Sequence, residues 1–82
     1  MTRTEIETAV LKALAEVAPE VNPGSMRRDT PLRDQVDLDS FDYLNFIVAL
    51  HKTTGVDVPE VDYPKLASIK EAVDYLARRS AG

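Results

Sequence analysis

The sequence contains no cysteine and no tryptophan, and it has only three glycines and one histidine. The lack of cysteine excludes disulfides and thiolate metal sites. Three isolated glycines cannot form a glycine-rich phosphate loop. The longest apolar run, residues 46–50, is far shorter than the roughly 20 residues of a membrane-spanning helix, and the N-terminus lacks the apolar stretch of a secretory signal. We therefore expect a cytoplasmic protein with no membrane partner.

Basic residues are also in the minority, with 10 Lys and Arg against 14 Asp and Glu, which gives a net charge of −4. This balance argues against nucleic acid as a partner. With 82 residues the chain is expected to form one small domain over 1–82, and such a domain buries only roughly 60% of its unfolded surface. Little room remains for a deep, water-excluded active site, so composition disfavours an autonomous enzyme.

The hydrophobic pattern predicts three main helices. The first covers about 5–17, and both Thr2-x-x-Glu5 and Thr4-x-x-Glu7 fit a capping box at its start. The second covers 40–54, with Asp39 as N-cap and Gly55 as the C-terminal stop. The last begins at a further capping box, Ser68-x-x-Glu71.

Two short elements are predicted between these helices. In the long connection over 19–38, Pro31 is expected at the first helical position of a brief turn, and a short element follows at about 62–66. Leu32, Val36 and Leu38 should fasten the connection to the core. The fold class is therefore all-α, with three main helices, one short helix and a long loop between the first two long helices.

The helix over 40–54 carries more apolar residues than one core contact needs. One group is expected in the core, and it comprises Tyr43, Phe46, Ile47 and Leu50. A second stripe continues from Ser40 and comprises Phe41, Leu44 and Val48. The pattern leaves open whether this stripe is buried or exposed to a partner.

Ser40 lies where a polar loop enters this helix, between Asp39 and Asp42. A hydroxyl on the first turn is presented rather than enclosed, and the helix start offers free N–H groups and a partial positive charge that favour an attached phosphate. The surrounding segment is acidic, and we expect its charge to steer basic surfaces toward Ser40. Its eight acidic residues are Asp29, Asp34, Asp37, Asp39, Asp42, Asp57, Glu60 and Asp62.

Two other readings of this segment fail on spacing. A serine hydrolase needs a base beside Ser40, but His51 follows eleven residues later on the same helix, about 16 Å away at about 1.5 Å per residue. A calcium-binding EF-hand counted from Asp37 places the wrong residue type at three positions, so no metal site is expected. A serine with only a structural role at the helix start remains a possible interpretation.

The run Leu-Asp-Ser-Phe-Asp-Tyr-Leu over 38–44, with Gly-Val-Asp-Val-Pro over 55–59 and Ala-Val-Asp-Tyr-Leu over 72–76, resembles acyl carrier proteins and peptidyl carrier domains. The resemblance covers nearly the whole chain and includes the order of helices. It implies a four-helix carrier, not itself an enzyme, whose Ser40 bears 4′-phosphopantetheine delivered from coenzyme A by a phosphopantetheinyl transferase. The arm's thiol would then carry acyl or aminoacyl groups as thioesters. Separately, because the one-sided apolar surface is limited, we expect a monomer.

The same resemblance implies roles for neighbouring residues. Asp39 and Phe41 would help the transferase to bind, whereas Leu44 and Val48 would contact a loading ligase and acyl-processing enzymes. Asp42 would meet the basic docking patches of those enzymes. The family usually has leucine where Phe41 stands, and this helix is poor in glutamate, so we expect a specialised lipid or secondary-metabolic pathway rather than housekeeping fatty-acid synthesis. The alternative is an unmodified interaction module that docks through Phe41, Leu44 and Val48.

Overall fold

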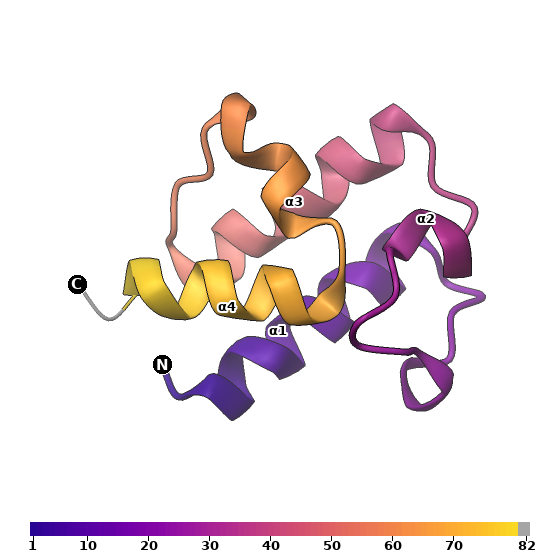
Figure 1. The fold of residues 1–82 in the computed structure, drawn as a ribbon, viewed down its shortest axis with the longest axis horizontal. Helices are drawn as coiled ribbons and strands as arrows, with labels where there is room; N and C mark the ends of the chain where they lie inside the picture. Colours follow the sequence, from indigo (N-terminus) through magenta and orange to yellow (C-terminus); the bar gives the residue numbers. More distant parts are fainter. Residues whose placement is uncertain (81–82) are drawn as a thin grey trace.

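The computed structural model describes residues 1–80 and shows an all-α fold, as the sequence predicts. Three long helices, α1 (Arg3–Val17), α3 (Ser40–Thr54) and α4 (Ile69–Ser80), form its body. The shorter elements are the helix α2 (Leu32–Gln35) and the 3-10 helices η1 (Pro23–Ser25) and η2 (Glu60–Leu66). In Figure 1 the N-terminus and the end of α4 lie on the left, and the long connection with α2 lies on the right.

Helix α1 is the centre of the packing, because it contacts both α3 and α4, and α4 in turn contacts η2. Each long helix contributes side chains that are fully shielded from solvent, among them Leu14, Phe46 and Leu76. Burial of a large apolar side chain contributes about 1.5–3 kcal/mol, so this shared interior is the main source of stability. The predicted core group of α3 is confirmed for Phe46, Ile47 and Leu50, while Tyr43 is half-buried.

The helix ends follow their sequence signals. Of the two candidate capping boxes, the one at Thr2 forms: its hydroxyl accepts from the Glu5 N–H at 3.1 Å, and the Glu5 carboxylate accepts from the Thr2 N–H at 2.8 Å. Helix α1 therefore starts two residues before the predicted position. At α3, the Asp39 carboxylate accepts from the Asp42 N–H at 2.7 Å, and Gly55 ends the helix with φ 73°. The predicted bounds of α3 are confirmed at both ends.

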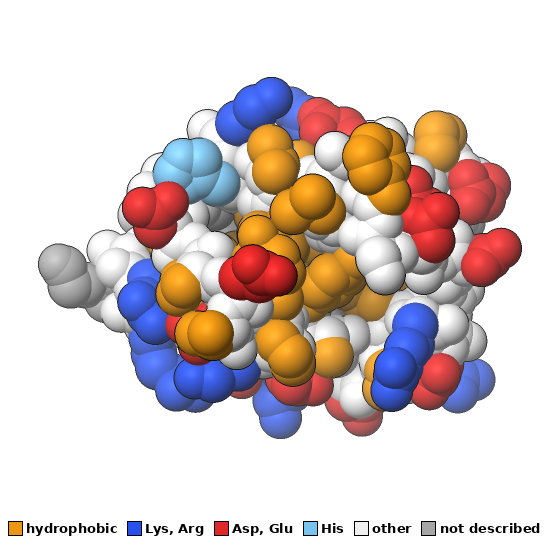
Figure 2. Space-filling view, turned by 90° about the horizontal axis from the view of Figure 1, so that it is seen from above, with side chains coloured by type: hydrophobic (Ala, Val, Ile, Leu, Met, Phe, Trp, Pro, Cys, Tyr) orange, Lys and Arg blue, Asp and Glu red, His pale blue; other side chains and the backbone are white. Residues whose placement is uncertain are grey.

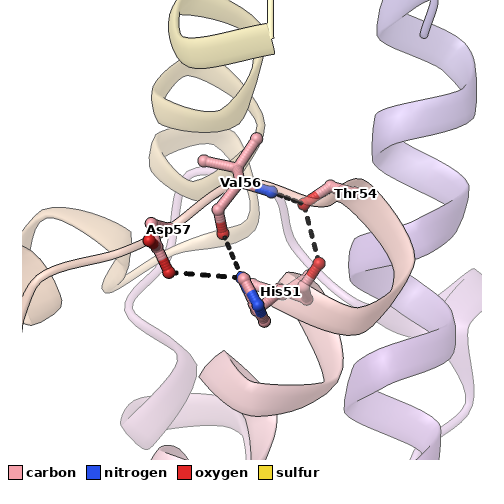
Figure 3. A network of polar contacts seen from close by, with 5 residues as sticks. His51, Thr54, Val56 and Asp57 are labelled. Carbon is pink, nitrogen blue, oxygen red and sulfur yellow. Dashed lines mark hydrogen bonds and ion pairs between the residues drawn. The ribbon is translucent and has the colours of Figure 1, made fainter.

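The last turn of α3 is tied to the segment that follows it by a small polar network (Figure 3). The Thr54 hydroxyl donates to the Leu50 carbonyl at 2.7 Å and accepts from the Val56 N–H at 3.2 Å. The His51 Nδ1 donates to the Val56 carbonyl at 3.0 Å and lies 3.5 Å from the Asp57 carboxylate. This network fixes the direction in which the chain leaves α3 toward η2.

The long connection is held against the body, as predicted, because Leu32 and Val36 are buried and Leu38 is partly buried. The position of Pro31 differs from the prediction. It is the residue before α2 rather than its first residue, and no side chain caps this helix. Instead, the Leu32 N–H donates to the Ala67 carbonyl at 2.7 Å, so a tertiary contact replaces the local cap.

A buried carboxylate joins η2 to α4. Asp62 is only 6% exposed and accepts hydrogen bonds from the Tyr75 hydroxyl at 2.6 Å and from Arg79 at 3.0 Å. Lys65 lies 3.2 Å from the same carboxylate. The expectation that all eight acidic residues steer basic surfaces toward Ser40 was therefore wrong for Asp62, because its charge is neutralised by Lys65 and Arg79 inside the fold.

Candidate functional site

Ser40 is the first residue of α3 and is exposed to solvent. Within residues 1–80 its hydroxyl forms no hydrogen bond with another protein group, because the adjacent N-cap position is filled by Asp39. The capping carboxylate holds the first turn in place while the serine side chain stays free. The geometry therefore presents an uncommitted hydroxyl at the positive end of a 15-residue helix.

The apolar stripe that continues from Ser40 is exposed to solvent. The sequence had left open whether this stripe is buried or exposed. Phe41 is 70% exposed, Leu44 42% and Val48 41%, whereas Asp42 is half-buried beside them. Val61 on η2 is 83% exposed and was not singled out from the sequence, since a lone apolar residue in a short element carries no periodic signal. Large apolar side chains in water over adjacent elements mark a contact surface.

Figure 2 looks onto the face of the molecule that α3 and η2 form. Hydrophobic side chains gather across this face, and acidic side chains crowd its right-hand edge, toward the α2 side of Figure 1. Asp39 and Asp42 flank Ser40 in the chain, and Asp34 and Asp37 precede it, all within this acidic segment. The apolar stripe is thus bordered by negative charge at the Ser40 end.

An open groove of about 790 Å³ begins at Ser40. Its walls come from the start of α3, from η2 and from the segment around α2. Apolar and aromatic side chains dominate the walls, among them Leu38, Tyr43, Leu44, Tyr63 and Pro64. A flexible group attached to Ser40 would therefore have an apolar surface directly beside its point of attachment.

The chain's only histidine cannot act on Ser40. His51 lies in the last turn of α3, near the opposite end from Ser40, and its Nδ1 is engaged with Val56 and Asp57 (Figure 3). Over eleven residues an α-helix rises about 16 Å, far beyond the reach of proton transfer. No imidazole is thus placed to activate the Ser40 hydroxyl within this chain.

Other chemistry finds little support in residues 1–80. No three His, Asp or Glu side chains in this part of the chain are grouped as metal ligands would be. None of its helices combines the length and the apolar character needed to cross a bilayer. The exposed serine, the apolar stripe and the groove remain as the features that could carry function.

Comparisons with known proteins identify a family that the chain resembles over most of its length. Residues 8–76 match the profile of a family described as "Phosphopantetheine attachment site". Relatives include an acyl carrier protein of Lactobacillus johnsonii, 28% identical over 93% of this chain and 94% of that protein. An acyl carrier protein of Campylobacter hominis is 28% identical over 88% of this chain and 85% of that protein. A mitochondrial acyl carrier protein of Saccharomyces cerevisiae is 29% identical over 83% of this chain, which spans 54% of that protein's length.

Proposed function

Since the chain belongs to the phosphopantetheine-attachment family, and is a carrier of that covalently attached group rather than an enzyme, we propose that Ser40 is the attachment residue. The observation that carries this proposal is the exposed, uncommitted hydroxyl at the start of α3. The groove beside it, lined by both apolar and charged residues, suits a long arm that carries alkyl segments and amide groups, and the helix start favours a phosphodiester.

The modification requires a separate transferase, because Ser40 has no base of its own. In that reaction the Ser40 Oγ attacks the phosphorus of coenzyme A that bears the pantetheine, and the pyrophosphate P–O bond breaks. Adenosine 3′,5′-bisphosphate leaves, and the serine proton passes to a base of the transferase. In the carrier, the Asp39 carboxylate stabilises the helix start by accepting a hydrogen bond from the Asp42 N–H. The largely exposed Phe41 ring provides an apolar contact for the transferase.

Once attached, the arm supplies the thiol that this cysteine-free chain lacks, and the thiol holds acyl or aminoacyl groups as thioesters. The names of the relatives favour acyl groups. Phe41 in place of the usual leucine and the glutamate-poor α3 support a specialised lipid or secondary-metabolic pathway with its own loading ligase. We propose that the protein works as a cytoplasmic monomer.

The attachment proposal is tested by incubating the protein with coenzyme A and a broad-specificity phosphopantetheinyl transferase, and then measuring its intact mass. The wild type should gain one phosphopantetheine, and Ser40→Ala should gain none. Ser25→Ala, at an exposed serine of η1, is the matched control and should be modified like the wild type. Modification of Ser40→Ala, or failure of the folded wild type to react, would refute the assignment.

The exposed stripe supports a docking role for α3. We propose that Leu44 and Val48 contact the partner's apolar surface, and that Asp42 meets a basic residue at its edge. Loaded protein carrying Leu44→Asp should keep its fold but lose acyl transfer to or from its partner, whereas Lys12→Asp, on the exposed side of α1, should behave as wild type.

The same stripe also favours a second candidate, an unmodified interaction module. The two functions differ in their dependence on Ser40. If Ser40→Ala retains full biological activity while Leu44→Asp abolishes it, the module is correct and the carrier is not.

A further inference from the structure

The groove beside Ser40 is closed at its base by an aromatic contact between α3 and η2. The Tyr43 hydroxyl donates to the Tyr63 carbonyl at 2.6 Å, and the two rings meet edge to face with their centroids 6.4 Å apart. Tyr43 also lies against Phe46, with 5.9 Å between ring centroids. Tyr43 therefore both hydrogen-bonds to η2 and covers the buried ring of Phe46.

Behind this contact the interior is filled. Phe46, Leu50 and Leu66 have no exposed surface, and they pack in one cluster with Tyr43 and Tyr63 at its edge. To enter between α3 and η2, a group on Ser40 would have to break the Tyr43–Tyr63 hydrogen bond and displace a half-buried ring. The carbonyl of Tyr63 would then lose its partner in an apolar setting, which is unfavourable.

The Tyr43 hydroxyl is a stable donor over the physiological range. Burial, with a smaller contribution from the negative charge of Glu71, raises its pKa to about 12. The closure therefore does not open by titration near neutral pH. Its strength rests on the geometry of the two tyrosines and on the packing behind them.

We infer that Tyr43 closes the space between α3 and η2, so that cargo stays in the open groove and is not taken into the core. This inference rests on the proposed attachment at Ser40. It assigns the carrier to cargo that tolerates exposure to water, namely short or polar acyl and aminoacyl groups. Tyr43 is then the residue that determines which cargo the protein can shelter.

The position of Ser40 indicates what occupies the groove, namely the arm attached to that residue. Ser40 lines the groove itself, so a group attached there reaches the apolar walls at high effective concentration without leaving the molecule. Arg33, Asp39 and Glu60 are the charged members of the lining, and they suit the polar atoms of an arm that lies along an open surface. A long alkyl chain in this groove would be covered on one side only.

The test uses the protein loaded by the transferase from a series of acyl-coenzyme A donors, so that Ser40 carries acyl-phosphopantetheine arms whose acyl groups have 2, 6 or 10 carbons. Intact mass first confirms that each arm is attached, so a failure at this step counts against the proposed function and not against the role of Tyr43. The thermal unfolding midpoint and the backbone amide NMR shifts of Phe46, Leu50 and Leu66 are then measured for each loaded form.

For the wild type we expect the same midpoint at every chain length and unchanged amide shifts at the three core residues. In Tyr43→Ala the midpoint should rise with chain length, because removal of the ring opens a path that the alkyl chain can fill. Pro31→Ala changes another exposed apolar residue of the groove without opening the core, and it should behave as the wild type does.

A wild-type midpoint that rises with chain length, or core amide shifts that move with it, would overturn the inference. So would a Tyr43→Ala protein that shows no dependence on chain length. If Tyr43→Ala does not fold, Tyr43→Val replaces it, and the wild-type amide shifts decide the question without any variant.

Discussion

Tyr75→Phe is the most direct test of how the fold holds η2 in place. The Tyr75 side chain is 8% exposed, and its hydroxyl donates to the Asp62 carboxylate at 2.6 Å. Phenylalanine keeps the ring, its packing, and the contact with the Arg79 guanidinium, which lies 4.8 Å from the ring centroid. The substitution thus removes one hydrogen bond and little else.

The expected loss follows from the charge of the acceptor. Hydrogen bonds to charged groups contribute about 1.5–3 kcal/mol, and the lower end applies to Tyr75 because its acceptor keeps two cationic partners. We therefore expect the free energy of unfolding to fall by about 1.5 kcal/mol. For a domain of this size about 4–8 °C corresponds to 1 kcal/mol, so the unfolding midpoint should fall by about 6–12 °C.

The same bond makes the loss dependent on pH. The hydrogen bond from Tyr75 is the main reason that the pKa of Asp62 lies below its ordinary value of 3.8, and the bond from Lys65 adds to it against the effect of burial. A lowered pKa contributes stability that is present above the unfolded pKa and is lost as pH falls through the folded pKa. The deficit of Tyr75→Phe should therefore be full at about pH 6 and shrink below about pH 4.

Urea unfolding followed by circular dichroism, at neutral pH and again in acid, measures both effects. In an Asp62→Asn background, Tyr75→Phe should cost less than it does in the wild type, because the acceptor is no longer charged. A Tyr75→Phe protein as stable as the wild type at neutral pH, or one whose deficit is the same in acid, would refute this account of the buried carboxylate.

Three further perturbations have expected outcomes. Phe46→Ala should reduce the free energy of unfolding by about 3–5 kcal/mol in urea titrations, since Phe46 is fully buried and its removal leaves a cavity. Gly55→Ala should cost about 1–2 kcal/mol in thermal unfolding, because its φ of 73° strains any side chain even though the space around it is open, whereas Lys52→Ala nearby should be neutral. Stability should also fall as pH rises from about 10 toward about 12, because burial raises the pKa of Tyr43 to about 12 and the unfolded chain ionises first; Tyr43→Phe, measured by urea unfolding followed by circular dichroism, should weaken that decline.

The sequence predicted best where local signals alone determine the structure. Helix α3 was bounded correctly because Asp39 caps it through the Asp42 N–H and Gly55 adopts the left-handed conformation that ends it. Both signals act within four residues and need no knowledge of the rest of the fold. Pro31 was misplaced because α2 is started by a distant partner, the Ala67 carbonyl, which no local pattern reveals.

In the candidate site, too, the sequence predicted the features set by local structure but not those set by tertiary packing. The exposure of Ser40 follows from its place at a helix start, but the exposure of Phe41, Leu44 and Val48 depends on which side of α3 faces α1. Periodicity placed the group with Phe46, Ile47 and Leu50 in the core, but it left open whether the second stripe is buried or exposed. The Asp62 network was missed because Tyr75 and Arg79 approach it from another helix, and an aspartate in an acidic segment looks like a surface residue.

The residues that stabilise the fold and the residues that present Ser40 to solvent lie in different parts of this small molecule. The buried carboxylate and its partners lock η2 to α4, and the fully buried side chains lie along α1, α3 and α4. At the start of α3, by contrast, the Asp39 cap lies at the surface, and Ser40 and Phe41 are left in solvent. Since the charges and packing that hold the fold do not involve the Ser40 hydroxyl, attaching a bulky group there requires no repacking. With Ser40 as the proposed attachment residue, the carrier can therefore be modified and loaded while its body stays unchanged.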